Sequence, residues 1–405
     1  MADVIELNGR RYRNPERPTV VICVDGCDPE YIDRGIHDGV FPTIGSFCRE
    51  GHLGTADAVV PTFTNPNNVS IVTGAPPSIH GIAGNYYLDR DSGREVMMTD
   101  EDLMRSETVL ALLARAGVKT AAITAKDKLR RLLGRNLDGI CFSSEGADGE
   151  TETLVGRGRP DMYSADLSLF VLDAGIKLLE RGRASLFYLS LSDYVQHAWG
   201  PGTSEADAFN RAIDDRVRHF VELGAVVGLV ADHGMNDKAL PDGEPNVIFL
   251  QDELNGRLGA GAVRVICPIT DPFVRHHGAL GSFVRVYARE KAEIPSLITA
   301  SAALPGVSLV LDGPSAARRF ELPLDREADF VVLGDDNTAI GATRAEHDLS
   351  GLTGHRLRSH GGLGEQAVPF ILSQPLTPRY RDIAATRRLR NFDIFDFVLN
   401  GVTRP

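Results

Sequence analysis

The stretch Thr19-Val-Val-Ile-Cys-Val-Asp-Gly26 decides the fold that we expect for this 405-residue chain. Its apolar run is almost unbroken, which is typical of a strand buried on both faces of a parallel sheet. Similar runs recur at residues 120–124, 185–191 and 225–230. The sequence therefore predicts a parallel sheet whose strands are separated by long stretches of chain.

Helical patterns separate these strand candidates. We predict helices over residues 107–116, 167–181 and 204–223, with Ser106 as the N-cap of the first. Each is followed by a glycine, which commonly ends a helix. The alternation of strands and helices predicts an α/β fold with a doubly wound, mostly parallel sheet and helices on both faces. Ligands of such sheets bind outside the carboxyl ends of the strands.

The pattern of predicted strands and helices changes near residue 256. Strand candidates at 282–288, 307–311 and 329–333 surround a helix candidate at 295–303. We predict a smaller α+β insertion over residues 256–349, which caps a core made of residues 1–255 and 350–405. Near the start of the chain, the Asn-Gly pair at 8–9 predicts a hairpin, because this dipeptide suits a two-residue turn with positive φ.

Composition narrows the classes of function. Lys and Arg number 43 against 55 Asp and Glu, so the net charge is −12, which argues against a nucleic-acid partner. The sequence has no run of 18 apolar residues and no apolar leader, so we expect no membrane span and a cytoplasmic location. Five cysteines without a CxxC pair argue against a disulfide scaffold. The oligomeric state stays open, a homodimer included.

Carboxylates stand where three of the predicted strands end. Asp25, Asp193 and Asp232 each follow an apolar run directly or within two residues. The carboxyl ends of parallel strands share one edge of a sheet, so we expect these side chains to converge. Buried carboxylates without partners are strongly unfavourable unless a cation compensates them. Taken singly, each is more often a turn or capping residue.

Histidines accompany the carboxylates. His197 lies four residues after Asp193, His233 adjoins Asp232, and His360 belongs to a glycine-rich segment. Three Asp and three His form a mixed oxygen and nitrogen set that suits two divalent cations, zinc foremost, with manganese or iron as substitutes. A lone histidine is usually structural, so the prediction rests on the joint pattern.

A second signal is Pro61-Thr-Phe-Thr-Asn-Pro66. Pro66 suits the first turn of a helix, which places Thr64 at the helix N-terminus, where free N–H groups favour anions. A hydroxyl there becomes a nucleophile once a metal lowers its pKa. Simple N-capping by Thr64 is the alternative. Asn85, after Gly84, is either a turn residue or a donor to a phosphoryl oxygen.

A third signal is basic. Lys126 and Lys128 follow the strand candidate at 120–124. They are either a solvated charge run at the start of a helix or a binding site for a second anionic group of the substrate. Cations at a helix start oppose the helix dipole, so their presence there invites an explanation beyond the helix itself.

These motifs together resemble the alkaline phosphatase superfamily, and within it the nucleotide pyrophosphatase/phosphodiesterase-like branch, from residue 20 to about residue 370. The resemblance implies two zinc sites. One would be held by Asp193, His197 and His360, and the other by Asp25, Asp232, His233 and the Thr64 oxygen.

Residues 84–87 and 125–129 further resemble the phosphonoacetate hydrolases of that superfamily. This likeness implies a small phosphonate substrate whose phosphonyl group meets Asn85 and whose carboxylate faces Lys126 and Lys128. It also implies cleavage of a carbon–phosphorus bond through a phosphothreonine on Thr64. The alternatives are a phosphodiesterase or phosphatase of the same superfamily, or a metal- and anion-binding protein without catalysis. His276 and His277 receive no role.

Overall fold

A computed structural model describes residues 4–270, 278–350, 352 and 356–403. Its largest element is a sheet of eight strands: β3 (Thr19–Cys23), β4 (His52–Asp57), β7 (Thr120–Thr124), β8 (Ile140–Ser143), β9 (Leu186–Ser190), β10 (Val226–Val230), β19 (Ala367–Leu372) and β20 (Leu389–Arg390). Their order across the sheet is β20-β4-β19-β10-β3-β9-β7-β8. Only β19 runs antiparallel to its neighbours among these described strands. The predicted mostly parallel sheet is confirmed.

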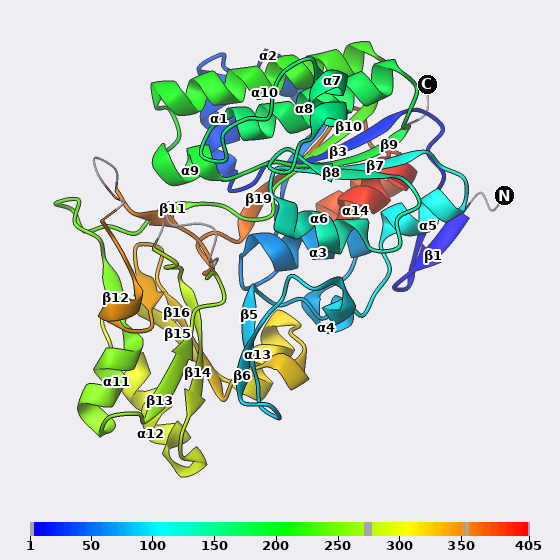
Figure 1. Ribbon diagram of the computed structural model, residues 1–405. Helices are drawn as coiled ribbons and strands as arrows, with labels where there is room; N and C mark the ends of the chain where they lie inside the picture. The colour runs from blue at the N-terminus through cyan, green and yellow to red at the C-terminus, as the bar shows by residue number, and fades with distance from the viewer. Residues whose placement is uncertain (1–3, 271–277, 351, 353–355, 404–405) are drawn as a thin grey trace.

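Helices cover both faces of this sheet, as predicted (Figure 1). One layer contains α1 (Pro29–His37), α2 (Pro42–Glu50), α7 (Gly149–Val155), α8 (Asp166–Glu180) and α10 (Ser204–Glu222). The other contains α3 (Thr64–Thr73), α4 (Pro77–His80), α5 (Val109–Arg115), α6 (Asp127–Gly134), α14 (Pro378–Thr386) and α15 (Ile394–Asp396). The short helix α9 (Tyr194–Ala198) follows β9 at the edge of the sheet.

Two local details test the sequence analysis closely. The hairpin is confirmed, since β1 (Val4–Leu7) pairs with β2 (Arg10–Arg13) through Asn8 and Gly9, both at positive φ. The predicted N-cap Ser106 is wrong. Thr108 caps α5 by accepting a hydrogen bond from the Ala111 N–H at 3.0 Å, whereas the Ser106 hydroxyl donates to the Glu107 carbonyl.

A second, antiparallel sheet lies beside the first unit. It consists of β13 (Val263–Ile266), β14 (Phe283–Ala288), β16 (Phe330–Gly334) and β15 (Val307–Asp312), in this spatial order. The helices α11 (Leu250–Leu258), α12 (Ile294–Ala302) and α13 (Gly313–Phe320) pack on it. Short pairs, β12 (Val247–Phe249) with β17 (Ala339–Gly341) and β11 (Asn236–Asp237) with β18 (Arg358–Ser359), lie in the connecting segments. The insertion boundaries 256 and 349 remain a prediction.

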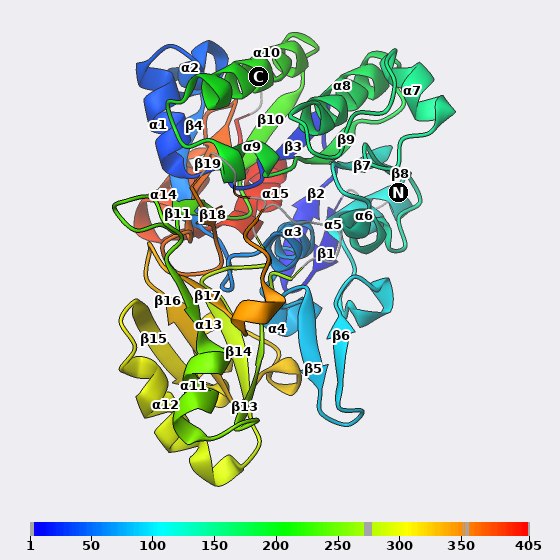
Figure 2. The same cartoon turned by 60° about the vertical axis from the view of Figure 1, so that its left-hand side comes forward.

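An early segment of the chain also packs against this second sheet. The hairpin of β5 (Tyr86–Asp89) and β6 (Arg94–Met97) runs alongside it in both ribbon views (Figure 2). Tyr86 and Leu88 pack on a small cluster of buried residues, Ile266, Tyr287 and Ala328. No strand was predicted or excluded here from the sequence. The segment that leads into the hairpin therefore joins the two units.

No helix among the described residues is long and apolar enough to cross a membrane. All five cysteines are free.

Gly175 provides a test of the close packing of α8 on the sheet. A Cβ at this position would lie 2.8 Å from a methyl group of Leu189 and 3.1 Å from the Phe220 ring. We expect Gly175→Val to lower the free energy of unfolding by about 1–3 kcal/mol, because the core is overpacked. The matched control is Gly256→Val in α11, where no atom lies within 4 Å of the added Cβ. Urea denaturation should show a change of less than about 0.5 kcal/mol for the control; equal losses would contradict the packing argument.

Candidate active site

The three predicted carboxylates meet at one edge of the large sheet. Asp25 follows β3, Asp193 follows β9 and Asp232 follows β10, and these strands are parallel neighbours in the order β10-β3-β9. All three side chains are buried. The fold therefore concentrates negative charge at the carboxyl ends of its central strands, as the sequence analysis expected.

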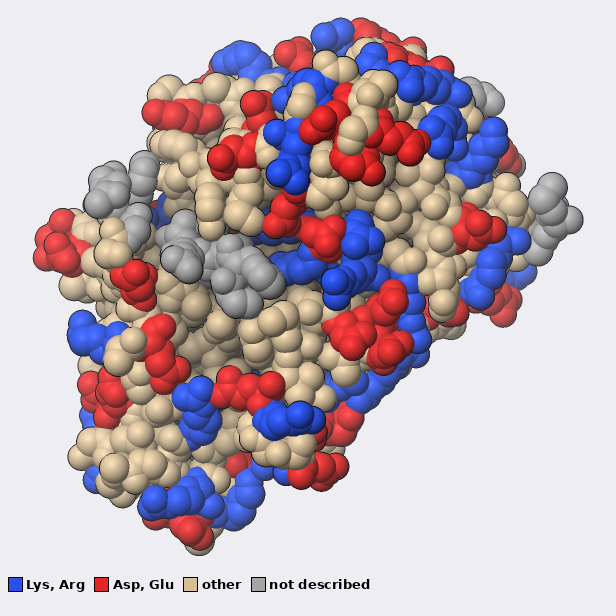
Figure 3. Space-filling view, in the orientation of Figure 1, with Lys and Arg blue, Asp and Glu red and all other residues tan. Residues whose placement is uncertain are grey.

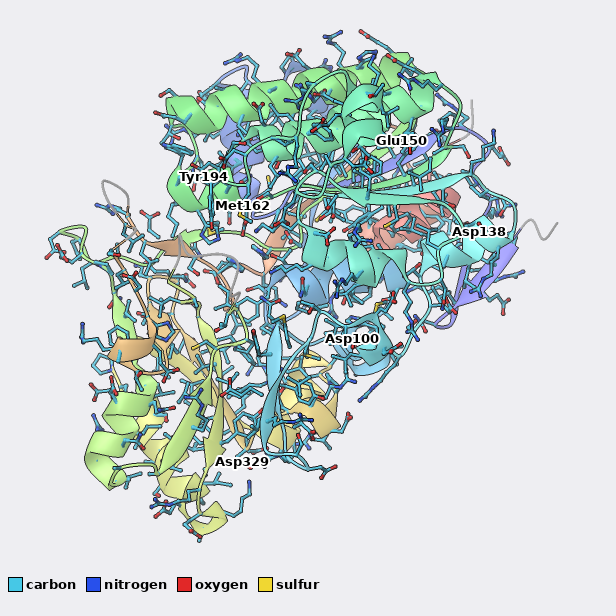
Figure 4. The ribbon with its side chains drawn as sticks, viewed as in Figure 1. Asp100, Asp138, Glu150, Met162, Tyr194 and Asp329 are labelled. Atoms are coloured by element: carbon cyan, nitrogen blue, oxygen red, sulfur yellow. The ribbon has the colours of Figure 1, made fainter. Side chains whose placement is uncertain are left out.

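Helix α9 brings His197 back onto Asp193. The His197 N–H donates to the Asp193 carbonyl at 2.9 Å, and His197 Nε2 lies 3.0 Å from Asp193 Oδ2. The four-residue spacing therefore corresponds to one helical turn, which places both side chains on one face. Tyr194, the first residue of α9, lies beside Met162 at the side of the first unit that faces the second sheet (Figure 4).

Three histidines are oriented by backbone carbonyls. In each ring Nδ1 lies 2.7–2.8 Å from a backbone carbonyl oxygen. The carbonyl belongs to Arg358 for His197, to Gly234 for His233 and to Thr62 for His360. A carbonyl only accepts hydrogen bonds, so Nδ1 carries the proton and Nε2 holds the lone pair in each neutral ring. This tautomer is the one that metal-ligating histidines commonly adopt.

The lone pairs on Nε2 face carboxylates. His233 Nε2 lies 3.3 Å from Asp25 Oδ1, and His360 Nε2 lies 3.9 Å from Asp193 Oδ2. Among the described residues, neither Asp25 oxygen has a hydrogen-bond partner. A lone pair that faces an ionised carboxylate is repulsive, so this donor set fits divalent cations held between the two.

The donor atoms form two overlapping trios. One consists of Asp193, His197 and His360, and the other consists of Asp25, Asp193 and His233. Within each trio the ligand atoms lie within 4.8 Å of one another. Asp193 belongs to both trios, so it can face two cations. The first trio is the set that the family resemblance implied for one site.

Asp232 lies next to the second trio without joining it. Its Oδ2 is 3.8 Å from His233 Nε2 and accepts a hydrogen bond from Asn68 Nδ2 at 3.0 Å. Its Oδ1 accepts from the Gly26 and His233 N–H groups at 3.3 and 3.1 Å. Its assignment as a ligand remains a prediction.

Burial disfavours charge throughout the cluster. It raises the pKa of Asp25 well above its ordinary value, with the charges of Asp193 and Asp232 adding to the effect. It raises the pKa of Asp232 to about 7. Burial also lowers the pKa of His233 and that of His360. His233 and His360 are therefore neutral near neutral pH, whereas ionised Asp25 and Asp232 need positive charge beside them.

Thr64 stands at the start of α3. It is the first residue of the helix, and its hydroxyl lies 3.4 Å from His233 Nε2. One turn later, Asn68 donates to Asp232 and accepts from the Tyr188 and Ser190 hydroxyls at 2.7 and 2.8 Å. The sequence analysis missed Asn68, although its spacing of four residues from Thr64 places both on one helix face.

The two lysines lie at the start of α6, where Lys126 is the N-cap and Lys128 is the second helical residue. Lys126 Nζ donates to Asp193 Oδ1 at 2.9 Å, a contact that the sequence did not indicate. Lys128 is half-buried. Lys and Arg side chains gather over α6 in the middle of the face shown in Figure 3, between groups of acidic residues. This local positive surface lies within an acidic protein.

Asn85 approaches from the junction with the second sheet. Its side chain is 7% exposed, and Nδ2 donates to the Ile269 carbonyl at 3.1 Å. Its backbone N–H donates to the Pro268 carbonyl at 2.7 Å. His276 and His277 lie outside the described residues.

Glu365 connects the segments that carry His233 and His360, and the sequence analysis did not single it out. Its carboxylate accepts from the Gly362 N–H at 2.9 Å and from Lys238 Nζ at 2.8 Å, and its carbonyl accepts from the Gly234 N–H at 2.8 Å. The Glu365 and Lys238 side chains are fully buried. The rings of His233 and His360 stack with centroids 3.6 Å apart.

The model of the type I phosphodiesterase / nucleotide pyrophosphatase family matches residues 19–362. The chain belongs to this family. A phosphonoacetate hydrolase from Sinorhizobium meliloti 1021, solved in complex with phosphonoacetate and with phosphonoformate, is 43% identical over 100% of both chains, with a TM-score of 0.92. The predicted resemblance, fold class and assignment as a hydrolase are thereby confirmed.

One further solved structure shares the fold, and two curated relatives match parts of the sequence. Murine ectonucleotide pyrophosphatase/phosphodiesterase 5 is 16% identical, with 96% of each chain covered and a TM-score of 0.65. A phosphonoacetate hydrolase from Penicillium oxalicum is 53% identical over 49 residues, which are 11% of this chain and 68% of that sequence. A pyrophosphatase/phosphodiesterase from Schizosaccharomyces pombe is 24% identical over 62% of this chain, and the match spans half of that protein's length.

The raised pKa values predict how metal binding depends on pH. Protons on Asp25 and Asp232 compete with cations, whereas His233 and His360 are already neutral. As the pH rises from about 5.5 to 7.5, zinc affinity of the metal-stripped protein should rise, by about tenfold per pH unit for each proton displaced. Isothermal titration calorimetry in buffers of different ionisation enthalpy measures both the affinity and the proton release. A pH-independent affinity without proton release would contradict the prediction.

Proposed function

We propose that this chain hydrolyses phosphonoacetate to acetate and phosphate, with two divalent cations, zinc foremost. The observation that carries the proposal is the Asp and His cluster beside Thr64, with Lys126 and Asn85 on its margins. The full-length likeness to a hydrolase that was solved with phosphonoacetate supports this choice of substrate.

The cations would be held by the two trios, with Asp232 and the Thr64 oxygen as further ligands of the second. When bound, they would neutralise the carboxylates, lower the pKa of the Thr64 hydroxyl and stabilise charge on the phosphonyl oxygens. The backbone carbonyls that hold Nδ1 of the three histidines keep the Nε2 atoms turned toward the cluster.

Thr64 acts as the nucleophile. Its Oγ1 loses the proton to solvent, attacks phosphorus and forms the O–P bond of a phosphothreonine while the P–C bond breaks. The electron pair of the broken bond leaves with the methylene carbon and delocalises into the neighbouring carboxylate. Protonation of that carbon from solvent gives acetate. Water then hydrolyses the phosphothreonine, which releases phosphate and restores the hydroxyl. Thr64 also begins an α-helix, whose free N–H groups favour an anion there.

Lys126 and Lys128 stabilise the negative charge of the leaving group. A carbanion is a poor leaving group unless its charge is spread, and the ammonium groups stabilise the ene-diolate that the substrate carboxylate becomes. Lys126 lies 2.9 Å from Asp193, at the margin of the donor cluster. The proposal requires Lys126 to exchange this partner for the substrate carboxylate. Asn85 donates its amide to a phosphonyl oxygen.

Replacement of Thr64 tests the nucleophile. Thr64→Ala should lower phosphate release from phosphonoacetate by a factor on the order of 10³ or more, because no oxygen remains to attack phosphorus. Zinc content by atomic absorption should stay close to that of the wild type, since the two trios keep all their donor atoms. Thr64→Ser is the matched control and should retain part of the activity. Normal turnover by Thr64→Ala would exclude the assignment.

Replacement of Lys128 tests the substrate class. Lys128→Ala should lower kcat/KM for phosphonoacetate by about 10–100-fold, which corresponds to the loss of one charge-assisted hydrogen bond. An aryl phosphate diester lacks the carboxylate, so kcat/KM for this substrate should fall by less than about threefold. The exposed Arg131→Ala, in the same helix, controls for general loss of positive charge. Equal losses on both substrates would favour a nucleotide phosphodiesterase or phosphatase of this family.

A further inference from the structure

The second sheet contains a buried ion pair that reaches into the junction between the two units. Arg285 of β14 pairs with Glu327 through two contacts, Nε to Oε1 at 2.8 Å and Nη2 to Oε2 at 3.0 Å. The Arg285 side chain is 0% exposed and that of Glu327 is 1% exposed. The remaining guanidinium nitrogen, Nη1, donates to the Ala83 carbonyl at 3.2 Å.

The bidentate pair fixes the direction in which Nη1 points. A guanidinium is planar and rigid, so two parallel contacts to one carboxylate set the position of its third nitrogen. Fully buried ion pairs can often be replaced by apolar residues without loss of stability. A buried pair at such a position can therefore have a role other than stability, and the role that the geometry offers is to hold the Ala83 carbonyl.

Ala83 is two residues before Asn85, and the intervening Gly84 is closely packed. Gly84 has a φ of +153°, and a Cβ on it would lie 2.7 Å from Cβ of Pro268 and 3.3 Å from Arg285 Nη1. The segment 83–85 is thus enclosed between Arg285 on one side and the end of β13 on the other.

Asn85 itself is held by hydrogen bonds of its backbone N–H, its backbone carbonyl and its side chain. Its backbone N–H donates to the Pro268 carbonyl at 2.7 Å, its carbonyl accepts from the Met98 N–H at 2.6 Å, and its Nδ2 donates to the Ile269 carbonyl. Its Oδ1 has no hydrogen-bond partner among the described residues. The anchoring through Nδ2 leaves one amide hydrogen for a ligand.

The hairpin after Asn85 is also held by contacts to the segment before β16. Arg90 donates to Asp329 at 3.0 Å and to the Glu327 carbonyl at 3.4 Å. Asp329 lies at the far end of this sheet from the large sheet, next to the hairpin of β5 and β6 (Figure 4). Glu327 therefore belongs to the contacts that seat both the segment before the hairpin and the hairpin itself.

We infer that Arg285 and Glu327 are positioning residues for Asn85: they hold residues 83–85 so that the Asn85 amide meets the phosphonyl group. This inference rests on the proposed function. It makes phosphonyl recognition depend on Arg285 of β14 and on Glu327, which precedes β16, and neither residue belongs to the two donor trios.

The test is a double-mutant cycle on the complete, metal-loaded protein. Arg285→Met/Glu327→Leu removes both charges together, so neither is left buried without its partner. With Asn85 present, kcat/KM for phosphonoacetate should fall by about 10–100-fold, and inhibition by inorganic phosphate should weaken in parallel. In the Asn85→Ala background the same double change should alter kcat/KM by less than about twofold, because no amide remains to be positioned.

The matched control is Arg216→Met/Asp173→Leu. This pair is also bidentate, with contacts of 2.7 and 3.1 Å, but joins α10 to α8 away from the junction. It should leave kcat/KM unchanged. If Arg285→Met/Glu327→Leu does not fold, as judged by circular dichroism, Glu327→Gln enters the same cycle. With Asn85 present, Glu327→Gln should then lower kcat/KM by a smaller factor, about three- to tenfold. In the Asn85→Ala background this loss should be absent.

The outcomes separate the two ideas. An unchanged kcat/KM in the variant, or an equal loss with and without Asn85, overturns the positioning role. Wild-type protein that releases phosphate from an aryl phosphate ester but not from phosphonoacetate overturns the proposed substrate instead. In that case the cycle, repeated with the ester, still decides whether Arg285 and Glu327 act through Asn85.

Discussion

Three buried carboxylates at one sheet edge are the constraint on which the rest of the site depends. Asp25, Asp193 and Asp232 are placed there by parallel neighbouring strands, and burial makes their mutual repulsion strong. The three histidines do not relieve it as cations would, because backbone carbonyls bind their Nδ1 atoms and the lone pairs on Nε2 face the oxygens. Positive charge from Lys126, and from cations at the candidate donor atoms, would relieve this repulsion, which gives a reason for a lysine at the margin of the cluster.

The convergence of these groups was predictable because it follows from strand direction alone. An apolar run that ends in Asp predicts a buried strand and a carboxylate at its carboxyl end, and parallel pairing brings the ends together. His197 was predictable from its helical spacing. The prediction of Ser106 as the N-cap of α5 was wrong. Thr108 also carries a hydroxyl that can cap a helix, and the sequence does not show at which of the two residues the helix begins. The roles of the carboxylates and histidines as metal ligands remain predictions.

The contacts that the sequence did not indicate are those between distant segments. Lys126 and Asp193 are 67 residues apart, and Asn85 meets the Ile269 carbonyl across 184 residues. Neither contact leaves a periodic pattern. The first joins segments that follow two different strands of the large sheet, and the second depends on how the two units meet. Asn68 is a different case, since its spacing from Thr64 was visible but asparagine in a helix usually signals only a cap or turn. Glu365 is similar: a lone glutamate after glycines gives no sign that it joins two ligand-bearing segments.

The division of the molecule into two units gives the proposed substrate two separate points of recognition. The large sheet and α6 supply the cation donors, Thr64 and the lysines, whereas the amide of Asn85 is seated by carbonyls at the end of β13. A substrate that joins a phosphonyl group to a carboxylate through one carbon is short, so these points must lie close together and stay fixed. Rigid seating of residues 83–85 by the second sheet meets this requirement better than a solvent-exposed loop would. A second unit that packs against the first can therefore set the length of the proposed substrate without contributing a reactive group.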